Sequence, residues 1–266
     1  MGQKTSELVL HLKKLDSAVL ALSGGLDSVF LMKALSLSGI RTLAVSGSTA
    51  TTPRRDLEDA IRYSEEFSVE HRVIDSGEMQ SESFLANSPE RCYFCKDSLF
   101  GKLVRIAREE GYKNVLDGGN LDDLQDHRPG RRAATEHAVI SPLMDCGFTK
   151  EDIRSSARDL GLAIADKPAS PCLSSRFAYG VSITPEGLMR VARAEDYIRD
   201  TLGIEELRVR DLGGRARIEV PADEVLSLIA KRALVVERLK LLGFAAVEID
   251  PEGFRSGKLN RVLDNG

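Results

Sequence analysis

The sequence lacks several features that would each assign it to a broad class. No apolar run approaches the ~20 residues that a membrane-spanning helix requires. Residues 1–15 mix Lys, Glu and Leu without the apolar core of a signal peptide, so we expect a cytoplasmic protein. The net charge of −4 does not favour a dedicated nucleic-acid binder. We therefore expect neither a membrane nor a nucleic acid as partner.

Cysteine is scarce, and internal repeats are absent. The chain has four cysteines among 266 residues. In a cytosolic protein of this size, four cysteines favour metal or redox chemistry over structural disulfides. The length suffices for one large domain or two ordinary ones. An irregular stretch with two prolines at 167–177 predicts a boundary, and we divide the chain into domains 1–178 and 179–266.

A glycine-rich turn between a strand and a helix is the strongest local signal. Residues 18–22 form an apolar run that predicts a buried strand, and 29–35 continue as an apolar helix. The turn between them contains small and acidic residues, which are Ser23, Gly24, Gly25, Asp27 and Ser28. The glycines let main-chain N–H groups approach an anion at the positive end of the helix dipole. Asp27 would repel a bare phosphate, so we expect Mg²⁺ to bridge them. The alternative is a plain junction with an Asp cap.

Strands and helices alternate through the first domain. The expected strands are 41–46, 69–75 and 115–117, and the expected helices are 53–67, 89–111 and 149–160. This βαβ pattern predicts a parallel sheet, on which ligands bind beyond the carboxyl ends of the strands. Ser46, Gly118 and Gly119 fall at such ends, so we expect them to contact a nucleotide. Asp122 and Asp123 follow there and are either metal ligands or solvated loop acids.

The second domain is expected to be a small α/β unit. Its predicted helices are 185–202 and a stretch ending at 242, and its predicted strands are 207–210, 216–220 and 247–250. Strand alternation sends Arg208 and Arg210 to the same face, which favours one shared anion. Surface salt bridging is the alternative interpretation for these arginines.

Three of the four cysteines form the second signal. Cys92 and Cys95 lie three apart on a predicted helix and so share a face, and Cys172 lies in the Pro-rich segment. Three thiolates suit a soft metal centre, with a 4Fe–4S cluster as the leading interpretation. A zinc site completed by His127 or water, and a redox pair at Cys92 and Cys95, remain alternatives. Cys146 has no partner spacing and is expected to be a half-buried thiol.

No Gly-Lys-Ser/Thr follows the glycines, so the turn at residues 23–28 is not a Walker-type loop. It resembles the Ser-Gly-Gly-x-Asp-Ser signature of the PP-loop ATP pyrophosphatases. Members of that superfamily activate an oxygen with AMP, release pyrophosphate, and then admit a nitrogen or sulfur nucleophile. The resemblance implies an adenine nucleotide alpha hydrolase-like domain that uses ATP and Mg²⁺.

Further motifs resemble the LarE family over nearly the whole chain. They are Asp-Gly-Gly-Asn at 117–120, Pro-Cys-x-Ser-Ser-Arg-Phe-x-Tyr-Gly at 171–180, Arg-Val-Arg at 208–210 and Gly-Phe-Arg-Ser-Gly at 253–257. LarE is a sulfur transferase that adenylates a carboxylate of pyridinium-3,5-biscarboxylate mononucleotide and replaces an oxygen with sulfur. The product becomes the nickel-pincer nucleotide cofactor of lactate racemase.

Side-chain charge suggests roles for individual residues in such a reaction. Ser175, Arg176, Arg208 and Arg210 would bind a substrate phosphate or carboxylate. Lys96 would stabilise charge on the phosphates or the activated carboxylate, unless it is an exposed helix lysine. Glu195 and Glu219 resemble acidic metal-site positions, with ordinary surface as the alternative. The smaller domain would serve substrate binding or oligomerisation, and we expect a homo-oligomer with a sulfide source as partner.

One departure from the best-known LarE form bears on the sulfur source. That form sacrifices a single cysteine, whereas here Pro171 stands about at that place, beside Cys172, and Cys92 and Cys95 are added. The pattern is similar to the cluster-bearing form, which implies that a 4Fe–4S cluster carries the transferable sulfide. The rival functions are a tRNA thiolation enzyme, an ammonia-using synthetase of the NAD or GMP synthase kind, and a nucleotide sensor or iron–sulfur carrier that does not split ATP.

Overall fold

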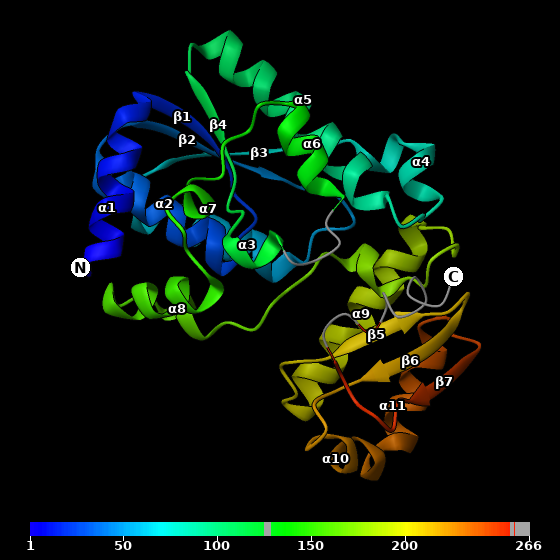
Figure 1. Cartoon of the computed structure of the whole chain (residues 1–266). Helices are drawn as coiled ribbons and strands as arrows, with labels where there is room; N and C mark the ends of the chain where they lie inside the picture. The colour runs from blue at the N-terminus through cyan, green and yellow to red at the C-terminus, as the bar shows by residue number, and fades with distance from the viewer. Residues whose placement is uncertain (125–128, 256–257, 259–266) are drawn as a thin grey trace. The chain divides into compact units, whose positions relative to one another are not determined.

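The computed structural model describes residues 1–124, 129–255 and 258. The chain divides into two compact units, which are drawn together in Figure 1. Unit 1 comprises residues 1–84 and 89–170, and unit 2 comprises 85–88 and the chain from Pro171 onward. The division thus falls between Ser170 and Pro171, inside the Pro-rich segment, rather than after residue 178. In the described part of the chain, no helix combines the length and apolar character that a membrane span requires.

Unit 1 is built on a parallel sheet of four strands, as the alternating pattern predicts. The strands are β1 (Ser17–Ala21), β2 (Arg41–Gly47), β3 (Glu70–Ile74) and β4 (Asn114–Leu116), in the order β3-β2-β1-β4. All neighbouring strands pair in parallel. After β1 the chain goes to one side for β2 and β3, and to the other side for β4. The turns that follow β1 and β4 therefore meet at the switch point, where open α/β sheets bind ligands.

Helices cover both faces of this sheet (Figure 1). Their bounds are α1 (Gln3–Leu12), α2 (Leu26–Ser38), α3 (Arg54–Glu66), α4 (Glu82–Leu85), α5 (Arg91–Glu110), α6 (Gly130–Glu136), α7 (Pro142–Asp145) and α8 (Lys150–Asp159). Alternation along β1 sends Ala18 and Leu20 into a core with α1, α2, α3 and α8. Val19 points to the opposite core, where it packs with α5 and α6. The central helix α2 is apolar almost all round because the sheet, α1, α3 and α8 enclose it.

Unit 2 contains a three-stranded sheet in the order β5-β6-β7, where β5 (Arg208–Asp211) and β6 (Arg215–Glu219) are antiparallel and β6 and β7 (Ala246–Ile249) are parallel. Its helices are α9 (Pro185–Leu202), α10 (Val225–Ala230) and α11 (Arg232–Leu241). Thr184 caps α9 by accepting the N–H of Gly187, and Gly203 ends it in a left-handed conformation. The helices and strands expected from sequence are found in both units, with ends that differ by a few residues.

Candidate nucleotide site and arginine cluster

The turn at residues 23–28, called the phosphate turn below, is closed by its own serines. The Ser28 hydroxyl donates to the Gly25 carbonyl at 3.0 Å and accepts the Ser23 N–H at 3.2 Å. Gly24 has φ of 74°, and a Cβ there would lie 1.8 Å from the Asp56 carbonyl oxygen. Position 24 therefore admits only glycine, because both the backbone angle and the packing against α3 exclude a side chain.

Main-chain donors at the start of α2 remain available. Gly25 is the N-cap and has no side chain to cap the helix. Within the described ranges, no acceptor contacts the N–H groups of Leu26, Asp27 or Ser28. Three adjacent donors at a helix N-terminus fit the anion-binding role that the sequence predicts for this turn, and that role stays a prediction.

Asp27 is held by two donors from distant segments. Its Oδ1 lies 2.5 Å from the Lys150 Nζ, and its Oδ2 accepts from the Asn120 amide at 3.2 Å. Lys150 begins α8, where Thr149 and Asp152 form a capping box, and its N–H donates to Asp122 at 2.8 Å. The sequence predicts this cap but gives no signal that the Lys150 ammonium reaches the phosphate turn.

The turn after β4 packs directly on the phosphate turn. A Cβ on Gly118 would lie 3.0 Å from the Ser28 nitrogen, so this glycine permits the close approach of two backbones. Asp117 accepts from Ser141 at 2.6 Å, from the Gly119 N–H at 3.0 Å and from Lys96 at 3.3 Å. Burial raises the pKa of Asp117, but Lys96 and the other donors outweigh it, so the pKa lies below its usual value. Lys96 is thus directed to the end of β4, as a site residue would be.

A second lysine that sequence reasoning missed fixes the phosphate turn from the other side. Lys167 donates to the Gly24 carbonyl at 3.0 Å, to Asp56 at 2.6 Å and to Asp59 at 2.7 Å. Burial raises the pKa of Asp59, but Lys167 and Arg62 outweigh it and lower the pKa. Lys167 therefore connects the phosphate turn to α3. The sequence predicts only an irregular Pro-rich segment here and gives no signal for this contact.

Three residues that the sequence places near the nucleotide make contacts within the protein. Ser46 is 3% exposed, and its hydroxyl donates to the Leu22 carbonyl at 2.7 Å and contacts His71 Nε2 at 2.9 Å. Its side chain therefore joins β3 to the residue that follows β1, so an adenine contact at Ser46 would use the backbone and stays a prediction. Asp122 accepts the N–H of Lys150 at the start of α8, and Asp123 accepts the nearby N–H of Asn120. Among the residues that the structure describes, no group of three His, Cys, Asp or Glu side chains is arranged for a metal.

The cysteines belong to both units. Cys92 and Cys95 lie near the start of α5 in unit 1, exposed and half-buried respectively, and the half-buried Cys172 lies in unit 2. None of the four cysteines forms a disulfide. Burial, with Asp145 and Glu7 nearby, raises the pKa of Cys146, which suits an inert thiol. His127, the zinc alternative, lies outside the described residues.

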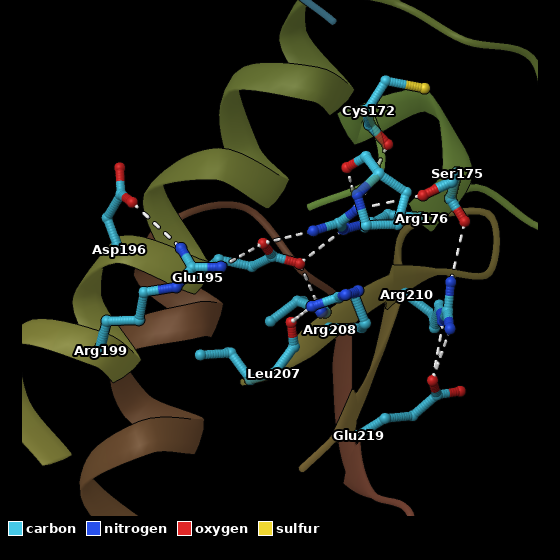
Figure 2. Close-up of polar contacts among 12 residues, drawn as sticks. Cys172, Ser175, Arg176, Glu195, Asp196, Arg199, Leu207, Arg208, Arg210 and Glu219 are labelled. Atoms are coloured by element: carbon cyan, nitrogen blue, oxygen red, sulfur yellow. Dashed lines mark hydrogen bonds and ion pairs between the residues drawn. The ribbon is translucent and has the colours of Figure 1, made fainter. Parts of the chain in front are cut away.

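Arg176 is the centre of a buried network in unit 2, shown in Figure 2. Its Nε and Nη2 donate to the two oxygens of Glu195 at 2.8 and 3.0 Å. Its Nη1 donates to the carbonyls of Pro171 and Cys172, at 2.6 and 3.2 Å, and to the Ser175 hydroxyl at 3.0 Å. The residue is 1% exposed. These contacts use the guanidinium donors within the protein, so they give Arg176 a structural task rather than the substrate contact expected from sequence.

The two arginines of β5 differ in their surroundings. Arg210 donates twice to Glu219 Oε2, at 2.9 and 2.7 Å, and once to the Ser175 carbonyl at 2.9 Å. Arg208 donates to the Leu207 carbonyl and lies 4.8 Å from the Phe254 ring. Burial, with Arg176 and Arg210 adding repulsion, lowers the pKa of Arg208 to about 10. A buried guanidinium among like charges is stabilised by an anionic ligand.

Glu195 and Glu219 are occupied by arginines. Besides Arg176, Glu195 accepts from Arg199 at 2.9 Å and from the Val209 N–H at 3.0 Å. Burial raises the pKa of Glu195, but the arginines outweigh it and lower the pKa. These contacts fill both Glu195 oxygens and do not fit a metal ligand, so no metal chemistry is assigned to this carboxylate.

Comparison with known proteins decides the family. No family model matches the sequence. An uncharacterised protein of Synechocystis is 42% identical over 99% of both chains. The pyridinium-3,5-bisthiocarboxylic acid mononucleotide synthase of Lactiplantibacillus plantarum is 34% identical over 99% of this chain and 96% of its own. The chain belongs to the LarE family. A tRNA-specific 2-thiouridylase of Rickettsia africae is 25% identical over 59% of this chain and 53% of its own, which fits LarE within the PP-loop superfamily.

Membership in LarE confirms two predictions made from sequence. The chain is an ATP-dependent sulfurtransferase, and its parallel sheet is that of a PP-loop ATP pyrophosphatase. The phosphate turn therefore has the place in the fold that nucleotide binding requires. The roles of individual LarE residues in this chain remain proposals.

Proposed function

We propose that the chain adenylates a carboxylate of pyridinium-3,5-biscarboxylic acid mononucleotide and converts it to a thiocarboxylate, in the synthesis of the nickel-pincer cofactor. The observation that carries the proposal is the 34% identity, over nearly the whole of both chains, to the synthase of the bisthiocarboxylic acid. The cytoplasm is the proposed location.

The reaction balances in two steps. A carboxylate oxygen attacks the α-phosphorus of ATP, and pyrophosphate leaves. A hydrosulfide then attacks the acyl carbon, AMP leaves with that oxygen, and one proton is released. We assign the phosphates to the free N–H groups at the start of α2, with Ser23, Gly24, Gly25 and Ser28 shaping the turn.

Asp27 is the carboxylate of the phosphate turn, and its hard oxygens fit Mg²⁺. When bound, Mg²⁺ would neutralise charge on the leaving pyrophosphate. Lys96, directed to the end of β4 by Asp117, would add positive charge beside it.

The substrate's own phosphate is assigned to Arg208 and Arg210, with the Ser175 hydroxyl. The lowered pKa of Arg208 supports this assignment, because an anion would relieve the crowding of three guanidinium groups. Arg176 instead holds the Pro171–Cys172 backbone through two carbonyls. We propose unit 2 as the substrate-binding and oligomerisation unit of a homo-oligomer.

For the sulfur source we propose a 4Fe–4S cluster on Cys92, Cys95 and Cys172. The absence of a disulfide at these cysteines and the helical spacing of Cys92 and Cys95 fit such a ligand set. When bound, a cluster on three thiolates would leave one iron for an added sulfide. The protein's part is to present the thiolates and to hold Cys172 through its backbone.

The test is an anaerobic reaction of the purified protein with ATP, Mg²⁺, sulfide and the biscarboxylic acid mononucleotide, with products identified by mass spectrometry. We expect a thiocarboxylate, together with iron and visible absorption that the triple variant of Cys92, Cys95 and Cys172 to Ser loses. Full thiocarboxylate formation in that variant would contradict the cluster as the sulfur source. Amide formation from ammonia, with no thiocarboxylate from sulfide, would favour an ammonia-using synthetase. Thiolation of tRNA with no thiocarboxylate would favour the tRNA enzyme, which the distant thiouridylase similarity keeps as the second candidate.

A further inference from the structure

Lys150 occupies the position in unit 1 where a divalent cation at Asp27 is expected. Its Nζ lies 2.5 Å from Asp27 Oδ1, and Asn120 takes the other oxygen. The Lys150 backbone is fixed by the cap of α8 and by its hydrogen bond to Asp122. An ammonium on a four-carbon stem at this point can move while its backbone stays in place.

The charges around the phosphate turn require an exchange when a nucleotide binds. Asp27 and Lys150 form a neutral pair beside three free N–H donors. A metal ion and the ammonium on the same Asp27 oxygen would repel each other at short range, which favours displacement of the ammonium. The polyphosphate that arrives with the metal is the nearest acceptor for the displaced ammonium.

We propose that Lys150 is a nucleotide-binding residue that moves from Asp27 to a phosphate oxygen of ATP as the divalent cation takes its place on Asp27. The inference rests on the proposed function for the use of ATP and metal, and it adds a residue to that site. The ammonium keeps Asp27 neutralised in the empty protein and neutralises phosphate in the loaded one.

Lys4 provides a matched control. Its Nζ pairs with Asp152 at 2.6 Å, also on the first turn of α8, and its side chain is 37% exposed against 35% for Lys150. Lys4 contacts the Gly147 carbonyl rather than Asp27. Lys4→Met therefore removes an equally exposed ammonium from the same helix start without touching the phosphate turn.

The test measures ATP affinity by calorimetry, without the carboxylate substrate, in EDTA and in Mg²⁺. In EDTA we expect Lys150→Met to bind ATP about tenfold to a hundredfold more weakly, since Asp27 then faces the polyphosphate without its neutralising ammonium. Mg²⁺ should strengthen binding by a larger factor in Lys150→Met than in the native protein, because no ammonium has to be displaced. Lys150→Arg should recover part of the affinity, and Lys4→Met should bind like the native protein.

Two results would overturn the proposal. One is an affinity of Lys150→Met within twofold of the native protein in both conditions. The other is a loss of equal factor in EDTA and in Mg²⁺, which indicates a structural role alone. Failure of the native protein to make thiocarboxylate, with the Lys150 pattern intact, would contradict the proposed function and leave this inference standing.

Discussion

Replacing Arg176 by Met is the substitution whose cost the structure defines best. The side chains of Arg176 and Glu195 are each 2% exposed, and two hydrogen bonds join them. Removing one partner of a buried ion pair costs about 3–5 kcal/mol, because the other charge stays buried without compensation. Arg199 and the Val209 N–H still contact Glu195, so we expect the lower end, about 3 kcal/mol.

The pH dependence of this deficit follows from the same contacts. In the native protein the pKa of Glu195 is lowered, so its contribution is lost as the pH falls through and below the ordinary value for Glu. In Arg176→Met burial dominates, and the pKa of Glu195 rises. The folded variant then binds a proton more readily than its unfolded chain. The difference in the free energy of unfolding between Arg176→Met and the native protein therefore shrinks as the pH is lowered.

Urea unfolding gives the free energy, and hydrogen–deuterium exchange of peptides from α9 and β5 locates the loss in unit 2. The carbonyls of Pro171 and Cys172 are released as well, so Cys172 should be alkylated faster. The control is Arg217→Met, whose pair with Glu248 is exposed at 40% and 51% and should cost at most about 1 kcal/mol. A loss within 1 kcal/mol for Arg176→Met, or unchanged exchange in α9 and β5, would refute the reasoning.

Three further predictions concern unit 1. Gly24→Ala should weaken ATP binding, measured by calorimetry, at least tenfold, because the added Cβ would collide with the Asp56 carbonyl. The control is Gly39→Ala: Gly39 also has a positive φ, of 73°, but no atom lies within 4 Å of an added Cβ, so this variant should bind ATP normally. Lys167→Met should lower the free energy of unfolding by about 3 kcal/mol, since the buried Asp56 loses the ammonium of Lys167 that pairs with it. Lys167→Arg should recover part of the loss, and an unchanged urea midpoint in Lys167→Met would contradict this prediction. The pKa of Asp152 is lowered to about 2, first by Lys4 and then by Thr149, so its stabilisation is full above pH 3.8 and is lost as the pH falls toward 2. The difference in melting temperature between Asp152→Asn and the native protein should vanish across that range, and a constant difference would exclude the pairing.

Local sequence signals predicted the elements because their causes are local. Apolar runs predicted the strands, the glycines predicted the phosphate turn, and Thr149 predicted the start of α8. The ion-pair partners were missed because they depend on contacts between distant segments, such as Lys150 with Asp27. Arg176 shows the same limit, since its pattern predicts an anion contact while its actual partners are Glu195 and two carbonyls.

The sheet topology explains why these distant residues meet. β1 and β4 are neighbours although 92 residues separate the end of one from the start of the other, from Ala21 to Asn114. Their following turns therefore share one edge, and α8 adds Lys150 there. A pattern limited to helical or strand spacing has no access to this arrangement.

The central claim is that ATP is consumed to make a carboxylate oxygen leave, so that sulfur can replace it. The most direct measurement is the fate of ¹⁸O in a substrate labelled at its carboxylates, under anaerobic conditions with ATP, Mg²⁺ and sulfide. We predict that each thiocarboxylate formed is matched by one pyrophosphate and by one AMP that carries ¹⁸O on its phosphate. Thiocarboxylate formed with unlabelled AMP, or labelled substrate left intact while pyrophosphate accumulates, would contradict the account.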